Sequence, residues 1–243
     1  GTLKRYNVND KALAIILSSQ AGNIEQVRQA FNILWRADID PTALQCPLPE
    51  NRRSSLEYNC SGKHAGMLAV CQQCNWPLNN YLERKHPVQQ LVLNKVSELL
   101  RMPAAEFISA HDDCGVPTYL MQLCQIATLY ARLSSGNNLD MERIVRAMTH
   151  HPQMLAGAGK FDTELMNLTP GELISKSGAE GLQCISRLGE GMGLVIKVMD
   201  GAKRAKYAVA IHIITTLGWI TPNTAEALEE NYMTRAIYTR VEV

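Results

Sequence analysis

Apolar residues recur at helical spacing as far as about residue 170, so this part of the chain is predicted to be mainly helical. One helix is expected to begin after the capping residue Asn23, and another at Pro87, which suits a first helical turn. A third is predicted over residues 118–133, and Asp140 is expected to cap a fourth. The expected inward positions are Ile24, Val27, Phe31 and Leu34 in the first helix, Val88, Leu91, Val92, Val96 and Leu99 in the second, and Tyr119, Leu123, Ile126, Ala127 and Tyr130 in the third.

The pattern changes after Pro170. Residues 172–176, 181–187 and 194–199 predict strands, and a glycine-rich turn over residues 189–193 predicts that the last two form a hairpin. A long apolar helix over residues 203–217, a helix starting at Thr221-Pro222 and a final strand over residues 236–243 are expected to follow. This order predicts an α+β fold in which a helical region lies beside an antiparallel sheet flanked by helices, with a cleft between them.

Composition excludes several classes of protein. The chain has 24 Lys and Arg against 23 Asp and Glu, so it lacks the basic excess of a nucleic-acid-binding protein. Hydrophobic residues make up 46% and charged residues 19%, which argues against disorder. No apolar run approaches the ~20 residues of a membrane span. The seven cysteines are an odd number in a chain too large to need disulfides, which predicts reduced thiols and a cytoplasmic protein.

Reactive side chains gather in three segments. Residues 59–66 place a thiol, a hydroxyl, an amine and an imidazole beside two glycines, before a helix expected to start near Met67. Glycine allows a ligand to approach the backbone, and a helix N-terminus favours thiolates, but an ordinary polar loop would look the same. Residues 111–117 place two carboxylates and a cysteine before a Gly-Val-Pro turn, which suits a metal, an amine or a simple Asx turn.

The third segment, residues 176–181, has Lys-Ser-Gly at a strand end, similar to the Lys-Thr-Gly element of penicillin-binding enzymes, although a basic turn is also common there. Two other pairs are interpreted as structural. Cys71 and Cys74 have redox or zinc spacing but lie within a helical pattern. His150-His151 lies at a helix end, where capping is the simpler interpretation.

Together and in this order, the three segments resemble the asparaginase II family, the asparaginases with a serine β-lactamase-like fold. Residues 60–67 match its Cys-Ser-Gly-Lys-His-Ala-Gly-Met segment, and residues 176–181 match its Lys-Ser-Gly-Ala-Glu-Gly segment. Residues 112–117 match Asp-Gly-Cys-Gly-Val-Pro with Asp113 in place of the first glycine, and residues 161–163 match Phe-Asp-Thr. The resemblance implies a single α/β sandwich-like domain over residues 1–243 that hydrolyses L-asparagine to L-aspartate and ammonia.

The family's chemistry implies two serine–lysine pairs. Ser19 and Lys176 match one of them, although Gln20 and Asn23 stand where the family has His and Glu. The other pair lies in a Ser-x-x-Lys segment that should precede Leu13. No serine of this chain has a lysine three residues later, so the chain is expected to lack the family's N-terminal part.

The resemblance also implies a zinc ion held by Cys60, Lys63 and Cys114. Two thiolates suit zinc, but lysine must lose its proton to bind, and lowering a pKa of ~10.4 to neutrality costs roughly 4–5 kcal/mol. Asp112 is expected to contact the substrate or to order the zinc ligands. The remaining expected substrate contacts are Ser61, His64 and Gly178, and backbone amides near Gly62 or Gly178 are candidates for stabilising an oxyanion.

Two other classes of protein stay open. The first is a catalytically impaired zinc- or ligand-binding protein on the same fold, which the absent Ser-x-x-Lys segment, Gln20 and Asp113 would favour. The second is a thiol redox protein that uses Cys71 and Cys74. For the leading hypothesis, L-asparagine is the expected small-molecule partner, nucleic acid and membrane are not expected partners, and a homodimer is left open.

Overall fold

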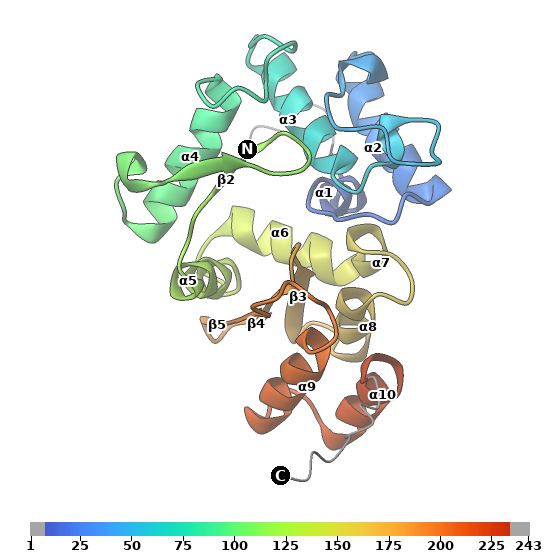
Figure 1. The fold of residues 1–243 in the computed structure, drawn as a ribbon, viewed down its shortest axis with the longest axis vertical. Coiled ribbons are helices and arrows are strands. Elements are labelled where there is room, and N and C mark those ends of the chain that lie inside the picture. The colour runs from blue at the N-terminus through green and yellow to red at the C-terminus, as the bar shows by residue number, and fades with distance from the viewer. Residues whose placement is uncertain (1–7, 234–243) are drawn as a thin grey trace.

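The computed structural model describes residues 8–233 and divides them into a helical region and a sheet region (Figure 1). Helices α1 to α4 form the helical region, and α5 to α10 surround a three-stranded sheet. The helices are α1 Asp10–Ile16, α2 Ile24–Arg36, α3 Ser61–Gln73, α4 Pro87–Leu100, α5 Leu123–Leu133, α6 Leu139–His150, α7 Pro152–Leu155, α8 Phe161–Leu168, α9 Lys206–Thr216 and α10 Pro222–Tyr232. The strands are β1 Ser109–His111, β2 Pro117–Tyr119, β3 Leu173–Ser177, β4 Leu182–Arg187 and β5 Met192–Lys197. The predicted mixed α+β class is therefore confirmed.

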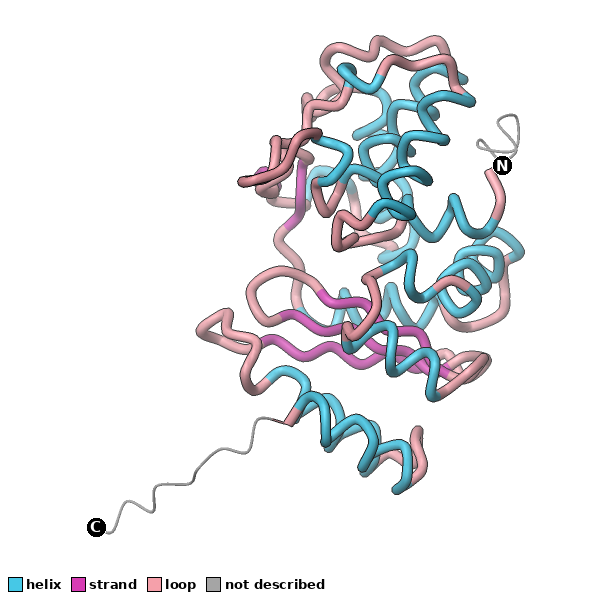
Figure 2. Tube along the Cα trace, turned by 90° about the vertical axis from the view of Figure 1, so that its right-hand side faces the viewer, coloured by secondary structure: helices cyan, strands magenta, loops and turns pink. Residues whose placement is uncertain are grey.

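The sheet has the order β3-β4-β5, and both pairs of neighbours are antiparallel, as the hairpin pattern predicts (Figure 2). Helices α5 and α6 lie on one side of the sheet, while α9, backed by α10, lies on the other. Side chains of a strand point alternately to the two sides. Leu173 and Ile185 therefore join the core under α9, and Ile174 joins the core shared with α6.

The helical region has its own core, formed where α1, α2 and α3 meet. Asn23 caps α2 as predicted, and Gln26 completes a capping box. The predicted apolar face is wrong in part, because Ile24 is 80% exposed and Phe31 is 40% exposed. Leu34 is buried as predicted, and Ala30 and Ile33 join it in the core, since the direction of the neighbouring helices decides which side of α2 is buried.

Other predicted elements are shifted. Residues 117–119 form strand β2, paired with β1, so the third predicted helix begins only at Leu123. Asn138, and not Asp140, caps α6. Helix α3 begins at Ser61, well before Met67. The predicted final strand, residues 236–243, lies outside the described residues.

Helix α4 begins at Pro87 and buries Val88 as predicted, but other predicted inward positions are exposed. Leu91 is 45% exposed and Val92 is 40% exposed, while Leu93 is buried. Helix α4 has apolar residues on more than one side, and it is packed on one side. The sequence pattern alone does not indicate which of these sides is buried. Within residues 8–233, no helix combines the length and the apolar character needed to cross a bilayer.

Candidate active site

Ser19 and Lys176 meet across the junction between the two regions. Ser19 is an exposed residue in the loop that follows α1, and Lys176 is half-buried in β3. The Lys176 Nζ donates hydrogen bonds to Ser19 Oγ at 2.7 Å and to the backbone oxygen of Ser177 at 2.6 Å. Burial lowers the pKa of Lys176, which favours the neutral amine that a base requires.

Backbone hydrogen bonds hold the Ser19 loop in place from both sides. The Ser19 N–H donates to the oxygen of Leu155 in α7 at 2.9 Å, and the Gln20 N–H donates to the oxygen of Asn59 at 2.9 Å. The buried Gln20 side chain adds bonds from its Nε2 to the backbone oxygen of Leu56 and to Ser61 Oγ. The loop is therefore tied to the segment that begins α3.

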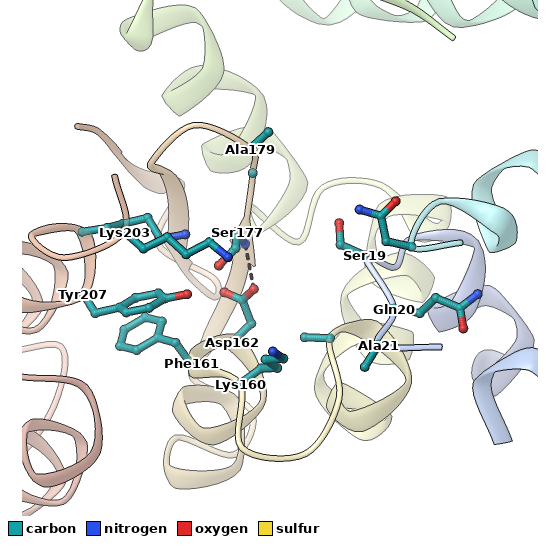
Figure 3. Close-up of a pocket in the computed structure, with 14 residues that line it drawn as sticks. Ser19, Gln20, Ala21, Lys160, Phe161, Asp162, Ser177, Ala179, Lys203 and Tyr207 are labelled. Atoms are coloured by element: carbon teal, nitrogen blue, oxygen red, sulfur yellow. Dashed lines mark hydrogen bonds between the residues drawn. The ribbon is translucent and has the colours of Figure 1, made fainter. Parts of the chain in front are cut away.

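Ser19 opens onto a pocket of about 310 Å³ between the helical region and the sheet (Figure 3). This volume is within the usual range for small-molecule sites. Gly178, a predicted substrate contact, lines the pocket, but its N–H already donates to Leu182 O at 2.9 Å. The pocket is lined by Ser19, Gln20, Ala21, Asn59, Ala156, Lys160, Phe161, Asp162, Ser177, Gly178, Ala179, Lys203, Lys206 and Tyr207.

Asp162 fixes the strand that carries the lysine. The residue is 3% exposed and lies in the first turn of α8, at the wall of the pocket. Oδ1 accepts hydrogen bonds from Ser175 Oγ at 2.6 Å and Gln183 Nε2 at 2.9 Å, and Oδ2 accepts one from the Ser177 N–H at 2.7 Å (Figure 3). In the sequence, the Phe-Asp-Thr match to the family pattern was the signal for Asp162, but it indicated no role for this carboxylate.

Three lysines of the pocket were also missed. Lys160 and Lys203 are exposed, whereas Lys206 is 1% exposed at the start of α9. Burial lowers the pKa of Lys206, and the negative charge of Asp162 opposes that shift. The sequence signal was a cluster of basic residues before a long apolar helix, which also describes an ordinary solvated helix start.

A second cluster lies at the start of α3. Ligand atoms of Cys60, Asp112 and Cys114 lie within 4.8 Å of one another, and Lys63 Nζ is 3.6 Å from Asp112 Oδ2. Cys60 caps α3, and the other two belong to the turn between β1 and β2. Gly115 allows this turn through its positive φ of 83°, which brings Asp112 and Cys114 back toward α3.

The charges in this cluster suit a soft divalent metal. A hydrogen bond from the Cys60 thiol, together with His64 and Lys63, lowers the pKa of Cys114 to about 2. The same bond and burial raise the pKa of Cys60. For Lys63, burial lowers the pKa, but the neighbouring thiols and Asp112 raise it more. Two sulfur donors and one carboxylate oxygen form a donor set that zinc accepts.

Ser61 and His64, two predicted substrate contacts, lie apart from the pocket. Both are 0% exposed in α3, and neither is among the residues that line the pocket. The Ser61 Oγ donates to Leu56 O at 2.8 Å, and His64 Nδ1 lies 2.7 Å from the Tyr81 hydroxyl. Asp112 is exposed beside the cysteines rather than in the pocket.

Cys71 and Cys74 are not joined by a disulfide. Cys71 is buried in α3 and Cys74 ends it, and both are free thiols. This agrees with a structural role for the pair, since the core around α1, α2 and α3 includes Cys71.

One comparison with known proteins identifies the family. The family model of L-asparaginase II matches residues 1–243. No curated protein matches the chain. The match covers both the serine–lysine pair and the cysteine cluster, which the fold brings to neighbouring positions at the junction of the two regions. The chain therefore belongs to the L-asparaginase II family, whose members are hydrolases of the L-asparaginase type.

Proposed function

We propose that the chain hydrolyses the side-chain amide of L-asparagine through a covalent ester on Ser19, with Lys176 as the base. The observation that carries this proposal is the 2.7 Å contact between Lys176 Nζ and Ser19 Oγ at the wall of a pocket. A serine hydroxyl is a weak nucleophile until a nearby base removes its proton. Because burial lowers the pKa of Lys176, its amine is neutral in a larger fraction of molecules than an exposed lysine would be.

The proposed reaction has two halves. Ser19 Oγ attacks the amide carbon as its proton passes to Lys176 Nζ, and the same proton leaves with the ammonia when the carbon–nitrogen bond breaks. Water then attacks the ester carbon and gives its proton to Lys176, which returns it to Ser19 as aspartate departs. The hydrogen bond from Lys176 to the backbone oxygen of Ser177 orients the amine through both halves.

The layout also supports the serine β-lactamase-like fold that the family resemblance implies. The Lys-Ser-Gly segment runs along the end of β3, and its lysine faces a serine that comes from the helical region. The antiparallel sheet has helices on both sides (Figure 2). The pocket lies at the junction of this sheet with the helical region.

Zinc is the metal that we propose for the cysteine cluster, held by Cys60 and Cys114. The carboxylate of Asp112 or the amine of Lys63 would complete the protein ligands. When bound, the ion would supply a positive charge that stabilises both thiolates and holds the β1–β2 turn against α3. Lys63 would need to lose its proton to bind, whereas an oxygen of Asp112 already lies close to both sulfur atoms, so Asp112 is the favoured third ligand.

Ammonia release from L-asparagine tests the function. Ser19→Ala and Lys176→Met are expected to lower kcat/KM by at least roughly 10³-fold, since each removes a member of a unit that acts together. Ser18→Ala is the matched control, because Ser18 is the neighbouring serine but its buried Oγ donates to Ile15 O at 2.7 Å. Mass spectrometry of the protein mixed with L-asparagine should show an adduct that Ser19→Ala lacks.

Two results would overturn the proposal. Full activity in Ser19→Ala would exclude the ester mechanism. A parent chain that binds zinc and L-aspartate but releases no ammonia at millimolar L-asparagine would instead be the zinc- or ligand-binding protein on the same fold.

A further inference from the structure

Lys206 is a buried cation with too few partners. Its side chain is 1% exposed, and its Nζ donates a single hydrogen bond, to Leu182 O at 3.3 Å. An ammonium group has three donors. Its Nζ also lies 4.7 Å from the centroid of the Tyr207 ring, which stabilises a cation only in part. Among residues 8–233, no carboxylate oxygen lies within 4.0 Å of this nitrogen.

Asp162 lines the same pocket but does not neutralise Lys206. Both of its oxygens already accept hydrogen bonds, from Ser175, Ser177 and Gln183. Its charge acts on Lys206 from a distance, but its hydrogen bonds come from β3 and β4 and none comes from the lysine. A buried ammonium without a paired anion is unfavourable, so an anionic guest in the pocket would be stabilised there.

Positive side chains outnumber negative ones among the residues that line the pocket. Lys160 and Lys203 line it with Lys206, and Asp162 is the only acidic lining residue. In Figure 3 the side chains of Lys203 and Tyr207 extend toward Ser177 and Asp162, on the side of the pocket opposite Ser19. A guest that presents its amide to Ser19 would therefore extend its other end toward these cations.

We propose that Lys206, with Lys203, binds the free carboxylate of the substrate, so that the site accepts small amino-acid amides whose α-carboxylate is unblocked. This inference rests on the proposed function for the identity of the guest, but the subsite itself requires only an anion. A neutral α-carboxamide would leave Lys206 without a counter-charge and is therefore expected to bind poorly.

Binding of L-aspartate to the intact protein, measured by titration calorimetry, tests the subsite without any turnover. Lys206→Met is expected to weaken binding roughly 10- to 100-fold, the range for losing a hydrogen bond to a charged group. Lys197→Met is the matched control, because Lys197 is half-buried and, like Lys206, donates to a backbone oxygen, that of Val198 at 2.8 Å, but lies outside the pocket. It should bind L-aspartate within twofold of the parent.

A second variant protects the test from a folding defect. Lys203 is exposed, so Lys203→Met should fold normally and still weaken L-aspartate binding. In the ammonia assay, both variants should raise KM for L-asparagine more than they lower kcat, and the α-carboxamide of asparagine should be a poor substrate for the parent. Unchanged L-aspartate binding in folded Lys206→Met and Lys203→Met would overturn the subsite.

The failure of the subsite and the failure of the proposed function are distinguishable. If the parent releases no ammonia but its L-aspartate binding depends on Lys206, the function fails and the subsite stands. If both lysine variants release ammonia with the parent's KM, the function stands and the subsite fails.

Discussion

Gly62 is the point at which α3 touches the end of α1, and Gly62→Ala tests that packing directly. A Cβ at Gly62 would lie 1.9 Å from the backbone oxygen of Ile15 and 2.7 Å from its carbonyl carbon. Ordinary contact begins at 3.4 Å, so the two helices would have to separate by about 1.5 Å here. Protein interiors are too densely packed to absorb such a shift without loss elsewhere.

The expected loss in the free energy of unfolding lies at the upper end of the range for overpacked cores. Inserted methyl groups usually cost about 1–3 kcal/mol, and a backbone neighbour has no rotamer with which to avoid the clash, so we expect about 3 kcal/mol. A chain of this size loses roughly 2–4 °C of Tm per kcal/mol, which predicts a fall of roughly 6–12 °C. Helix α1 ends at Ile16, shortly before Ser19, so displacing this end should also move Ser19 and lower activity.

Thermal and urea unfolding measure the effect, and Gly66→Ala in the same helix is the comparison. A Cβ at Gly66 would meet the Cγ2 of Ile16 at 2.7 Å, which is a side chain and can move. We therefore expect Gly66→Ala to cost less than half as much as Gly62→Ala. A Gly62→Ala protein whose free energy of unfolding is within about 0.5 kcal/mol of the parent would refute the close contact between α1 and α3.

Three further predictions concern charge and metal. Burial lowers the pKa of Lys176, so between that lowered pKa and about pH 10.4 the unfolded chain binds more protons than the folded chain. The parent's stability should therefore rise with pH in this window, and Lys176→Met should show a shallower rise in urea unfolding; equal slopes would contradict the shift. Purified protein should hold about one zinc ion per chain by elemental analysis. Cys60→Ala and Cys114→Ala should lose the ion, and the control Cys71→Ala should keep it. A parent protein without zinc would exclude the site. Asp162→Asn should lower the free energy of unfolding by about 1–3 kcal/mol. The amide nitrogen of the new asparagine would face one of the three donors that now bond to the carboxylate, and that donor would lose its acceptor. An unchanged urea midpoint would show that these buried hydrogen bonds contribute nothing to stability.

Features set by neighbouring residues were predictable from the sequence. The cap at Asn23, the proline at the start of α4 and the glycine-rich turn between β4 and β5 each act within a few residues, and the structure has all three. The strand at Pro117 was not predictable in this way. It forms because Gly115 reverses the chain and lets β2 pair with β1, and this turn outweighs the helical spacing of the apolar residues that follow.

The site was predictable where a motif marked it and unpredictable where the fold alone creates it. Motifs pointed to Cys60, Cys114 and Lys176, and the structure places each of them in a cluster. The roles of Asp162 and Lys206 depend on burial and on hydrogen bonds to distant strands. Neither property has a local pattern, because the same residue types on an exposed helix would be ordinary solvated charges.

Gln20 shows how a departure from the family pattern can be structural. Sequence comparison alone presents it as the loss of a histidine beside Ser19. In the structure its Nε2 donates to the backbone oxygens of Leu56 at 3.1 Å and Tyr58 at 3.2 Å, and also to Ser61 Oγ. An amide can hold these acceptors without changing its charge with pH, unlike an imidazole. Because Ser61 directly follows a proposed zinc ligand, Cys60, the same side chain ties the Ser19 loop to the segment that carries the metal cluster.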